Sequence, residues 1–227
     1  MRSAGLRFEA RPRTEDLWYC SPWHKWSTFR WFHPKEGEVV IDVGANIGTY
    51  SLSAAKAGAR VIAIEPNPAT FESLVKHMRY NSLTRSVTPM RVALGSLPGT
   101  GRLFLPESST GTASLLPDWA HVNDIDPRSA ATVTIVPMDS IVLISSLPRV
   151  DWMLIDVEGY EVEVLKGAIG TLQRTRRMII EVGSGSNSER CESLLRESGF
   201  QIMDKGSWSQ LNEYWLAENT GKSRPAA

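Results

Sequence analysis

The sequence predicts an α/β protein with a mostly parallel sheet, helices on both faces of the sheet and an antiparallel hairpin at one edge. From residue 39 onward, short β-branched runs alternate with segments of helical spacing, which is typical of parallel strands joined by helices. The run VVIDV at residues 39–43 is almost continuously apolar, as expected for a strand buried on both faces. A short connection separates the last two strands, which favours an antiparallel pair.

The remaining elements follow in order along the chain. The predicted strands are residues 39–43, 60–64, 87–94, 132–136, 151–157, 178–182, 200–203 and 211–217, with a short strand at 102–105. The predicted helices are residues 47–57, 69–80, 160–172 and 187–198, and a further helix begins at 140–145. Residues 95–118 are rich in Gly, Ser, Thr and Pro, and we expect them to form a functional loop.

Composition limits the class of partner. A chain of 227 residues suits one sizeable α/β core. Lys plus Arg and Asp plus Glu both number 25, so no overall field favours nucleic acid or an anionic membrane, and we expect a small-molecule partner. There is neither an apolar run of the ~20 residues that span a bilayer nor a secretory signal, which predicts a cytoplasmic protein. Cys20 and Cys191 fit no metal or disulfide pattern and are expected to be reduced thiols.

The amino-terminal segment, residues 1–38, differs from the main domain at 39–217 and from a polar tail at 218–227. It concentrates aromatic residues, namely Trp18, Tyr19, Trp23, Trp26, Phe29, Trp31 and Phe32. Such density is unusual on a bare surface. The favoured interpretation is a helix that packs its aromatics onto the main domain. The alternative, compatible with the first, is a lid or wall of an acceptor pocket.

A strand, a turn and a helix together predict a nucleoside-cofactor site. Residues 39–51, VVIDVGANIGTYS, contain Gly44 and Gly48, which permit a tight turn and close approach of a ligand to the helix. Glu65 ends the next strand, where a carboxylate can accept hydrogen bonds from both hydroxyls of an adenosine ribose. The alternative is that Asp42 and Gly44 only end a strand and form a turn.

The glycine spacing bears on which cofactor is bound. A dinucleotide-binding turn has the pattern G-x-G-x-x-G because its pyrophosphate lies against bare backbone. Residues 44–48 read GANIG, without a glycine two positions after the first. S-adenosylmethionine (SAM) carries an adenosine but no phosphate, and its sulfonium cation suits the carboxylates of Asp42 and Glu65. The pattern therefore favours SAM, with S-adenosylhomocysteine as product, over NAD.

Five acidic residues fall at or just beyond strand carboxyl ends, where open parallel sheets bind ligands: Asp42, Glu65, Asp156, Glu158 and Glu181. A carboxylate in such an acid-rich crevice can have its pKa raised enough to act as a base. Asp156 is the leading candidate for a residue near the reacting group, and Glu158 is next.

Several roles of these residues stay open. Glu158 can instead stabilise the following helix amino terminus. A divalent metal between Asp156 and Glu158 is possible but is not predicted, because two carboxylates make a weak signature. His121 is either a catalytic base or a surface imidazole.

The chain resembles the FkbM-type family of SAM-dependent methyltransferases. The resemblance rests on residues 36–74, on STGTASL at 109–115, on VTIVPMDSI at 133–141, on VDWMLIDVEGYEVEVLKGA at 150–168 and on IIEV at 179–182. The motifs DVGANIG and IDVEGYE in this order are specific. The resemblance implies a Rossmann-like class I methyltransferase fold with seven strands. It also implies methyl transfer to a hydroxyl oxygen of a sugar, polyketide or other secondary metabolite.

The resemblance also implies roles for individual residues. The expected cofactor-binding residues are Asp42, Gly44, Ala45, Asn46, Gly48, Glu65, Pro66, Asn67, Ala93, Leu94 and Asp156, with Asp156 and Glu158 on the reacting side. Many relatives carry Lys at the position of Leu154, so no lysine-assisted role transfers to this chain. A NAD-dependent oxidoreductase and a non-catalytic nucleoside-binding module are the alternatives.

Overall fold

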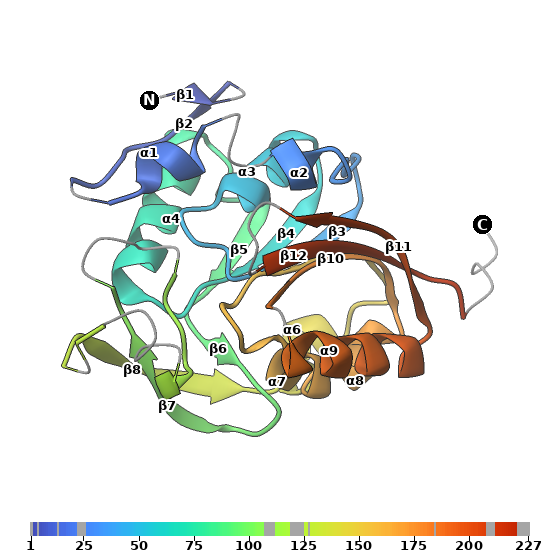
Figure 1. Cartoon of the computed structure of the whole chain (residues 1–227). Helices are drawn as coiled ribbons and strands as arrows, with labels where there is room; N and C mark the ends of the chain where they lie inside the picture. Colours follow the sequence, from blue (N-terminus) through green and yellow to red (C-terminus); the bar gives the residue numbers. More distant parts are fainter. Residues whose placement is uncertain are drawn as a thin grey trace.

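A seven-stranded sheet forms the centre of the molecule (Figure 1). The computed structural model describes residues 2–3, 5–12, 14–21, 26–106, 112–118, 125–126, 128–183, 185–207 and 212–221. The strands of this sheet are β3 (Val39–Val43), β4 (Arg60–Ile64), β5 (Val87–Met90), β9 (Val150–Ile155), β10 (Thr175–Gly183), β11 (Phe200–Ser207) and β12 (Asn212–Asn219). Their spatial order is β11-β12-β10-β9-β3-β4-β5.

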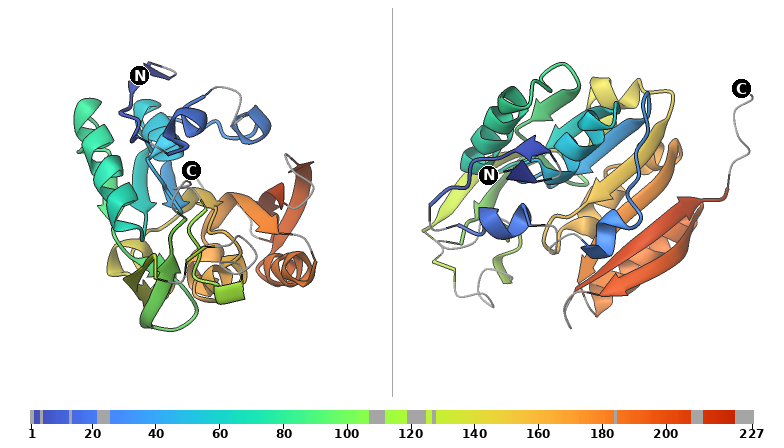
Figure 2. Two further views of the ribbon diagram at one scale, coloured as in Figure 1. Left: turned by 60° about the vertical axis from the view of Figure 1, so that its left-hand side comes forward. Right: turned by 90° about the horizontal axis from the view of Figure 1, so that it is seen from above.

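The strand directions confirm the predicted sheet. β10, β9, β3, β4 and β5 run parallel to one another, whereas β12 runs antiparallel to both β10 and β11. The hairpin β11–β12, coloured red, forms one edge of the sheet in the right-hand view of Figure 2. The mostly parallel sheet with an antiparallel edge pair is therefore as expected.

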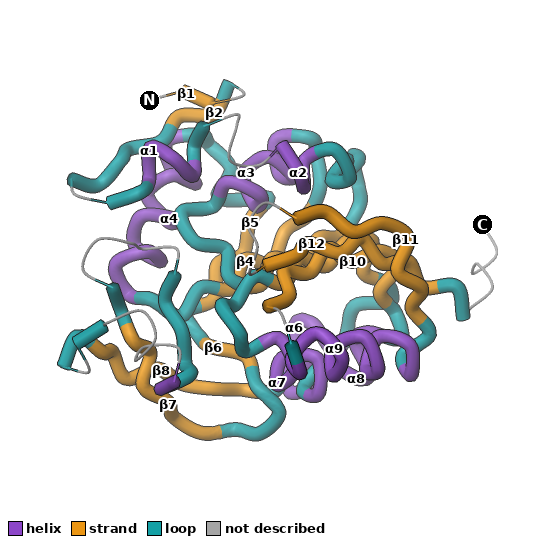
Figure 3. The backbone as a smooth tube through the Cα atoms, in the orientation of Figure 1, coloured by secondary structure: helices purple, strands orange, loops and turns teal. Residues whose placement is uncertain are grey.

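Helices cover both faces of the sheet, and each layer has its own hydrophobic core (Figure 3). One layer contains α3 (Thr49–Lys56) and α4 (Pro68–Tyr80). The other contains α6 (Val142–Ser145), α7 (Glu161–Lys166), α8 (Ile169–Leu172) and α9 (Ser186–Glu197), with the short 3₁₀ helix η1 (Met138–Ser140). The two cores explain why the strands are apolar at almost every position.

Alternation along β3 decides which way each side chain points. Val39, Ile41 and Val43 belong to the core beneath α6–α9, whereas Val40 belongs to the core beneath α3 and α4. Because side chains alternate with period two, Asp42 points to the same side as Val40. Its carboxylate therefore faces α3.

The amino-terminal segment packs partly into the core beneath α3 and α4. It contains β1 (Arg2–Ser3), β2 (Leu6–Arg7), α1 (Asp16–Tyr19) and α2 (Trp26–Phe29), rather than one long helix. The ring of Phe32 lies edge-on against the rings of Tyr50, at 5.7 Å, and Trp152, at 5.4 Å. Part of the predicted aromatic packing is thus present, whereas Trp23 lies outside the described residues.

The predicted strand at residues 87–94 is wrong in its extent. The chain leaves the central sheet after Met90, and β6 (Ala93–Leu94) joins a separate three-stranded sheet with β7 (Gly99–Phe104) and β8 (Ala130–Val136). Pro89 lies in β5, at the edge of the sheet, where a residue without an N–H group is tolerated. The region expected to be a loop from residue 95 therefore begins with a strand, β7, that is longer than the predicted 102–105.

The predicted helix at residues 160–172 is divided into α7 and α8. The backbone of Gly167 packs directly against the carbonyl of Gly95, where a side chain would not fit. Asp139 then accepts hydrogen bonds from the N–H groups of Gly170, at 2.7 Å, and Thr171, at 2.8 Å, and so caps α8. These contacts between distant segments interrupt a helix that local spacing predicts as continuous.

The carboxyl-terminal strand, the two cysteines and the lengths of the helices can also be compared with the expectations. β12 includes Glu218 and Asn219, so the segment expected to be a tail begins within a strand. Cys20 and Cys191 are both buried. None of the described helices is long and apolar enough to cross a membrane.

Candidate active site

A cavity of about 230 Å³ opens at the carboxyl ends of β3, β4, β9 and β10. Its main-domain lining is Val43, Gly44, Ala45, Asn46, Tyr50, Ile64, Glu65, Pro66, Val92, Ala93, Leu94, Leu103, Thr112, Ala113, Leu115, Asp156, Val157, Glu158, Tyr160, Glu181, Asn212 and Tyr214. Glu15, Trp18 and Tyr19 of the amino-terminal segment complete the described lining. This is the position at which open parallel sheets bind ligands.

The glycine turn after β3 uses its own N–H groups. The N–H groups of Gly44 and Ala45 donate to the carbonyl of Ile64, at 2.9 and 3.0 Å, and that of Asn46 donates to Glu65 at 2.9 Å. A pyrophosphate at a helix amino terminus needs such groups as donors. Since all three already have acceptors within the protein, this turn is poorly suited to a dinucleotide.

Glu65 is held at the edge of the cavity by backbone donors. Its Oε2 accepts from Asn46 and its Oε1 accepts from the N–H of Asn67 at 2.8 Å. Each carboxylate oxygen can accept a further hydrogen bond. Burial raises the pKa of Glu65 to about 7, opposed by these two backbone hydrogen bonds. The carboxyl group is thus oriented, while retaining lone pairs for a ligand.

Three predicted cofactor residues lie outside the cavity lining. Asp42 is 2 % exposed and accepts a hydrogen bond from the Ser51 hydroxyl of α3 at 2.5 Å. Gly48 adjoins the side chains of Leu74 and Leu52. The Asn67 side chain caps α4 by accepting from the N–H of Ala69 at 3.1 Å.

Asp42, Gly48 and Asn67 hold the turn and the two helix starts in place. Contact between these three residues and the cofactor stays a prediction. The other predicted cofactor residues all line the cavity, namely Gly44, Ala45, Asn46, Glu65, Pro66, Ala93, Leu94 and Asp156.

Three carboxylates gather on the other side of the turn. One oxygen from each of Asp156, Glu158 and Glu181 lies within 4.8 Å of the others. Asn212 donates to Glu181 at 2.8 Å. Burial, with the adjacent charge of Asp156, raises the pKa of both Glu158 and Glu181 well above the usual value. A cluster of this kind favours a positively charged ligand or an added proton.

The structure also bears on the alternative roles of Glu158, a divalent metal and His121. Glu161, rather than Glu158, accepts a hydrogen bond from the N–H of Gly159, at 2.8 Å, just before α7. Glu158 has a left-handed backbone, with φ of 53°, and lines the cavity. The oxygen atoms of the three carboxylates could coordinate a hard divalent cation. His121 lies outside the described residues.

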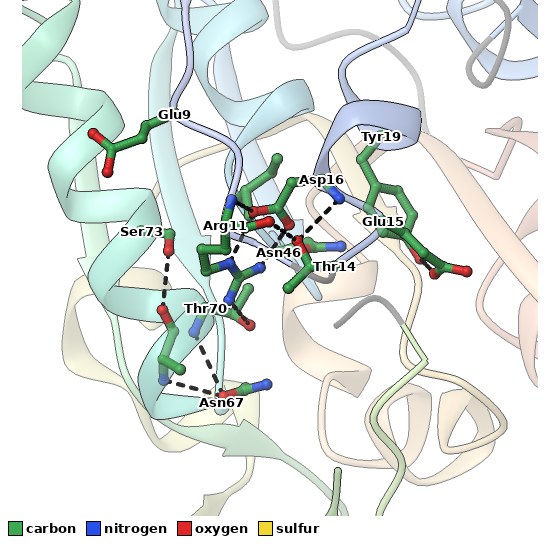
Figure 4. A network of polar contacts seen from close by, with 12 residues as sticks. Glu9, Arg11, Thr14, Glu15, Asp16, Tyr19, Asn46, Asn67, Thr70 and Ser73 are labelled. Carbon is green, nitrogen blue, oxygen red and sulfur yellow. Dashed lines mark hydrogen bonds and ion pairs between the residues drawn. The ribbon is translucent and has the colours of Figure 1, made fainter. Parts of the chain in front are cut away.

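The wall formed by α1 is tied to the main domain through Arg11, whose partly buried ion pair with Asp16 is drawn in Figure 4. Arg11 donates to both carboxylate oxygens of Asp16, at 2.9 and 2.8 Å, and to the Thr70 hydroxyl of α4 at 3.1 Å. Asp16 is fully buried. Because such bidentate pairs fix orientation as well as distance, they hold the neighbouring Glu15 and Tyr19 at the cavity.

Sequence reasoning did not assign several of these lining residues. Tyr50, Tyr214 and Asn212 come from α3 and β12, and nothing in their local sequence marks them as ligand contacts. The sequence places Glu181 on the acidic rim that would attract a cation, without assigning it a role of its own. The density of aromatic residues near Trp18 was the one signal that pointed toward the α1 wall.

The two sides of the cavity differ in chemistry. Beside Glu65 the wall is mainly apolar, with Ile64, Pro66, Val92, Ala93, Leu94 and Leu103. Beside Asp156 it is acidic and aromatic. β3, which leads into the glycine turn, lies between β4, which precedes Glu65, and β9, which precedes Asp156. The arrangement can bind a nucleoside on one side and hold a cationic group on the other.

An open-sheet α/β fold with such a cavity is the architecture of nucleoside-cofactor enzymes. The methyltransferase FkbM domain model matches residues 42–202. The chain belongs to this family.

Similarity to curated proteins extends over most of the chain. The hexuronic acid methyltransferase AglP of Haloferax volcanii is 30% identical over 167 residues, which cover 72% of this chain and 64% of that protein. The chain thus spans less than two thirds of the length of AglP. The methyltransferase sdnD of Sordaria araneosa is 27% identical over 198 residues, covering 75% of this chain and 76% of its own.

Solved structures with low sequence identity share the fold. Trm5b from Pyrococcus abyssi superposes with a TM-score of 0.51 at 18% identity, covering 96% of this chain and 54% of its own. At this identity the similarity supports the class I methyltransferase architecture and no statement about substrate.

Proposed function

We propose that this chain is a SAM-dependent O-methyltransferase that methylates a hydroxyl group of a small molecule and releases S-adenosylhomocysteine. The observation that carries the proposal is that Glu65 and Asp156 line one cavity from opposite sides of the glycine turn. A sugar, polyketide or other secondary metabolite is the acceptor class that the family resemblance and the name of the archaeal relative support.

In the proposed complex, the adenosine lies along the mainly apolar side. Glu65 would accept hydrogen bonds from the ribose hydroxyls, because its oxygens are oriented by Asn46 and Asn67 and retain lone pairs. Ala93 and Leu94 would contact the adenine ring. The methionine end would extend past Gly44 toward Asp156, whose negative neighbourhood suits a sulfonium cation.

The chemical step is a displacement at the methyl carbon. The acceptor oxygen forms a bond to this carbon as the bond from carbon to sulfur breaks, and the hydroxyl proton must leave. We assign Asp156 as the proton acceptor, with Glu158 beside it. The protein's main contribution is to align the hydroxyl with the methyl group, and a positioned base adds further acceleration.

The occupied N–H groups of the glycine turn support SAM over a dinucleotide. The backbone N–H groups of Gly44, Ala45 and Asn46 already donate to acceptors within the protein, and the carboxylates of the lining would repel a diphosphate. Isothermal titration with SAM and with NAD tests the choice. We expect SAM to bind and NAD not to bind, and preference for NAD would contradict the proposal.

Methyl transfer itself is tested with labelled SAM and a panel of hydroxylated acceptors. We expect label in an ether product with release of S-adenosylhomocysteine. Tight binding of SAM without transfer to any acceptor would favour the non-catalytic binding module instead.

Glu65→Ala is expected to weaken SAM binding by about 1–3 kcal/mol, because the ribose hydroxyls lose a charged acceptor. Isothermal titration measures the change. Glu72→Ala, a change of the same type on α4 outside the described lining, is the control and should leave the affinity unaltered. If Glu65→Ala also left it unaltered, Glu65 would not contact the ribose.

The affinity for SAM is expected to rise with pH as Glu65 ionises. Burial, with a contribution from Asp42, raises the pKa of Glu65 to about 7, while the backbone hydrogen bonds and Arg11 act in the opposite direction. Ribose hydroxyls bind best to the ionised form, so binding strengthens as pH rises through 7 and levels off above it.

The measurement for this pH dependence is the dissociation constant of SAM between about pH 6 and pH 8 for the wild-type chain and for Glu65→Gln. The ionisation of SAM is common to both proteins, so the difference between the two curves isolates Glu65. Parallel curves would show that Glu65 does not titrate in this range.

A further inference from the structure

The acceptor side of the cavity is rich in carboxyl groups. Asp156, Glu158 and Glu181 form the cluster at its base, and Glu15 joins the lining from α1. The charge of Glu15 is close enough to help raise the pKa of Glu158. Among the described lining residues none is Lys, Arg or His.

Aromatic side chains line the cavity together with these acids. Trp18 and Tyr19 come from α1, and Tyr50 and Tyr214 come from α3 and β12. Aromatic faces attract ammonium groups through their quadrupoles. Carboxylates combined with aromatic rings are therefore the chemistry that recognises an organic cation, which is a second feature independent of the acidic cluster.

A buried acceptor in the same cavity has no protein partner. Oδ1 of Asn46 is inaccessible to solvent and makes no hydrogen bond in the described part of the chain. Because this atom is inaccessible, a ligand can reach it only if the side chain moves. The acceptors that the cavity itself presents are its carboxylates, and these favour ligands that bring donors.

We propose that the acceptor of this methyltransferase is a hydroxylated amine, such as an amino sugar, whose protonated amino group lies between the α1 wall and the Asp156 cluster. The proposal rests on the proposed function and specifies its substrate class. An amine brings N–H donors and positive charge, whereas an acceptor with a carboxylate would meet four acids without a described cationic partner in the lining. Burying the carboxylate of the acceptor beside the carboxylates of the cavity is unfavourable.

Glu15 is the residue that we expect to tune this preference. It lies at the mouth of the cavity, where Tyr19 donates a hydrogen bond to its Oε2 at 3.1 Å. The ion pair of Arg11 with the adjacent Asp16 anchors α1, so the carboxylate of Glu15 has a defined place beside Tyr19 (Figure 4). Removing its charge should alter charge preference without removing the cluster at the base.

The experiment compares three acceptors that differ in charge: methyl 2-amino-2-deoxyglucoside, methyl glucoside and methyl glucuronoside. Their dissociation constants are measured at pH 7 in the presence of sinefungin, whose ammonium group replaces the sulfonium of SAM. We expect the amine to bind at least about 10-fold more tightly than the neutral sugar and the uronate to bind most weakly.

Several results would overturn the proposal. They are equal binding of the amine and the neutral sugar, preference for the uronate, and no binding by any of the three. A preference for the amine that appears with S-adenosylhomocysteine but vanishes with sinefungin would show that the cluster serves the sulfonium alone. In each case, retained SAM binding and methyl transfer to other alcohols would leave the proposed function standing.

A matched pair of variants tests whether Glu15 contributes to the preference for the amine. Glu15→Gln should reduce the ratio of amine to neutral affinity about two- to fivefold, as expected for a charge that is partly solvated. Glu9→Gln makes the same change on the same segment, but Glu9 faces Lys76 and Tyr80 of α4, away from the described lining. It should leave the ratio unchanged, and identical behaviour of the two variants would contradict the assignment of Glu15.

Discussion

Asp156→Asn is expected to lower the turnover of methyl transfer about 10²- to 10⁴-fold, the contribution typical of a positioned acid or base. The amide keeps the shape of the side chain but cannot accept the hydroxyl proton. Because Asp156 lies across the glycine turn from Glu65, the affinity for SAM should change far less than turnover.

Two measurements separate these effects, namely single-turnover rates with labelled SAM and isothermal titration of SAM. Asp204→Asn is a suitable control, since Asp204 is exposed on β11 and pairs with Arg30 outside the described lining. Equal losses of affinity and turnover in Asp156→Asn would make Asp156 a binding residue. An unchanged turnover would move the proton acceptor elsewhere.

Gly44→Ala is expected to reduce the affinity for SAM by about 100-fold or more and to lower the thermal stability. Residue 44 has φ of 82°, a conformation that costs an L-residue roughly 1–2 kcal/mol. The added Cβ would also collide with the backbone carbonyl of Asp156. The end of β3 and the end of β9 would have to separate, which displaces both sides of the cavity at once.

Titration with SAM and thermal melting measure the two parts of this prediction. Gly183→Ala is the matched control, because Gly183 ends β10 with open space around it and an ordinary φ. It should leave binding and melting temperature nearly unchanged. Wild-type affinity in Gly44→Ala would mean that the close approach of these two strand ends is not needed for the cofactor.

The features predicted correctly from the sequence are those that depend on near neighbours. The alternation of β3, the glycine turn and the position of Glu65 at the end of β4 all follow from patterns within about 25 residues. The predicted boundaries of helices and strands were wrong where segments distant in the sequence meet. Gly167 ends α7 because it packs against Gly95, which no local pattern reveals.

The same distinction applies to the candidate site. Acidic residues at strand ends were predicted to share one rim, yet Asp42 turns away because its neighbour Val40 belongs to the core beneath α3. Glu15 and Tyr214 reach the cavity from the two ends of the chain.

By itself, the sequence determined the class of fold and the glycine turn after the first strand of the main domain, because hydrophobic periodicity and glycine geometry act locally. Its motifs also identified the family. Only the tertiary structure decided which side chains share the cavity. That choice depends on strand order and on segments more than a hundred residues apart, such as those that bring Glu15 and Asp156 to one cavity, and local spacing carries no information about such proximity.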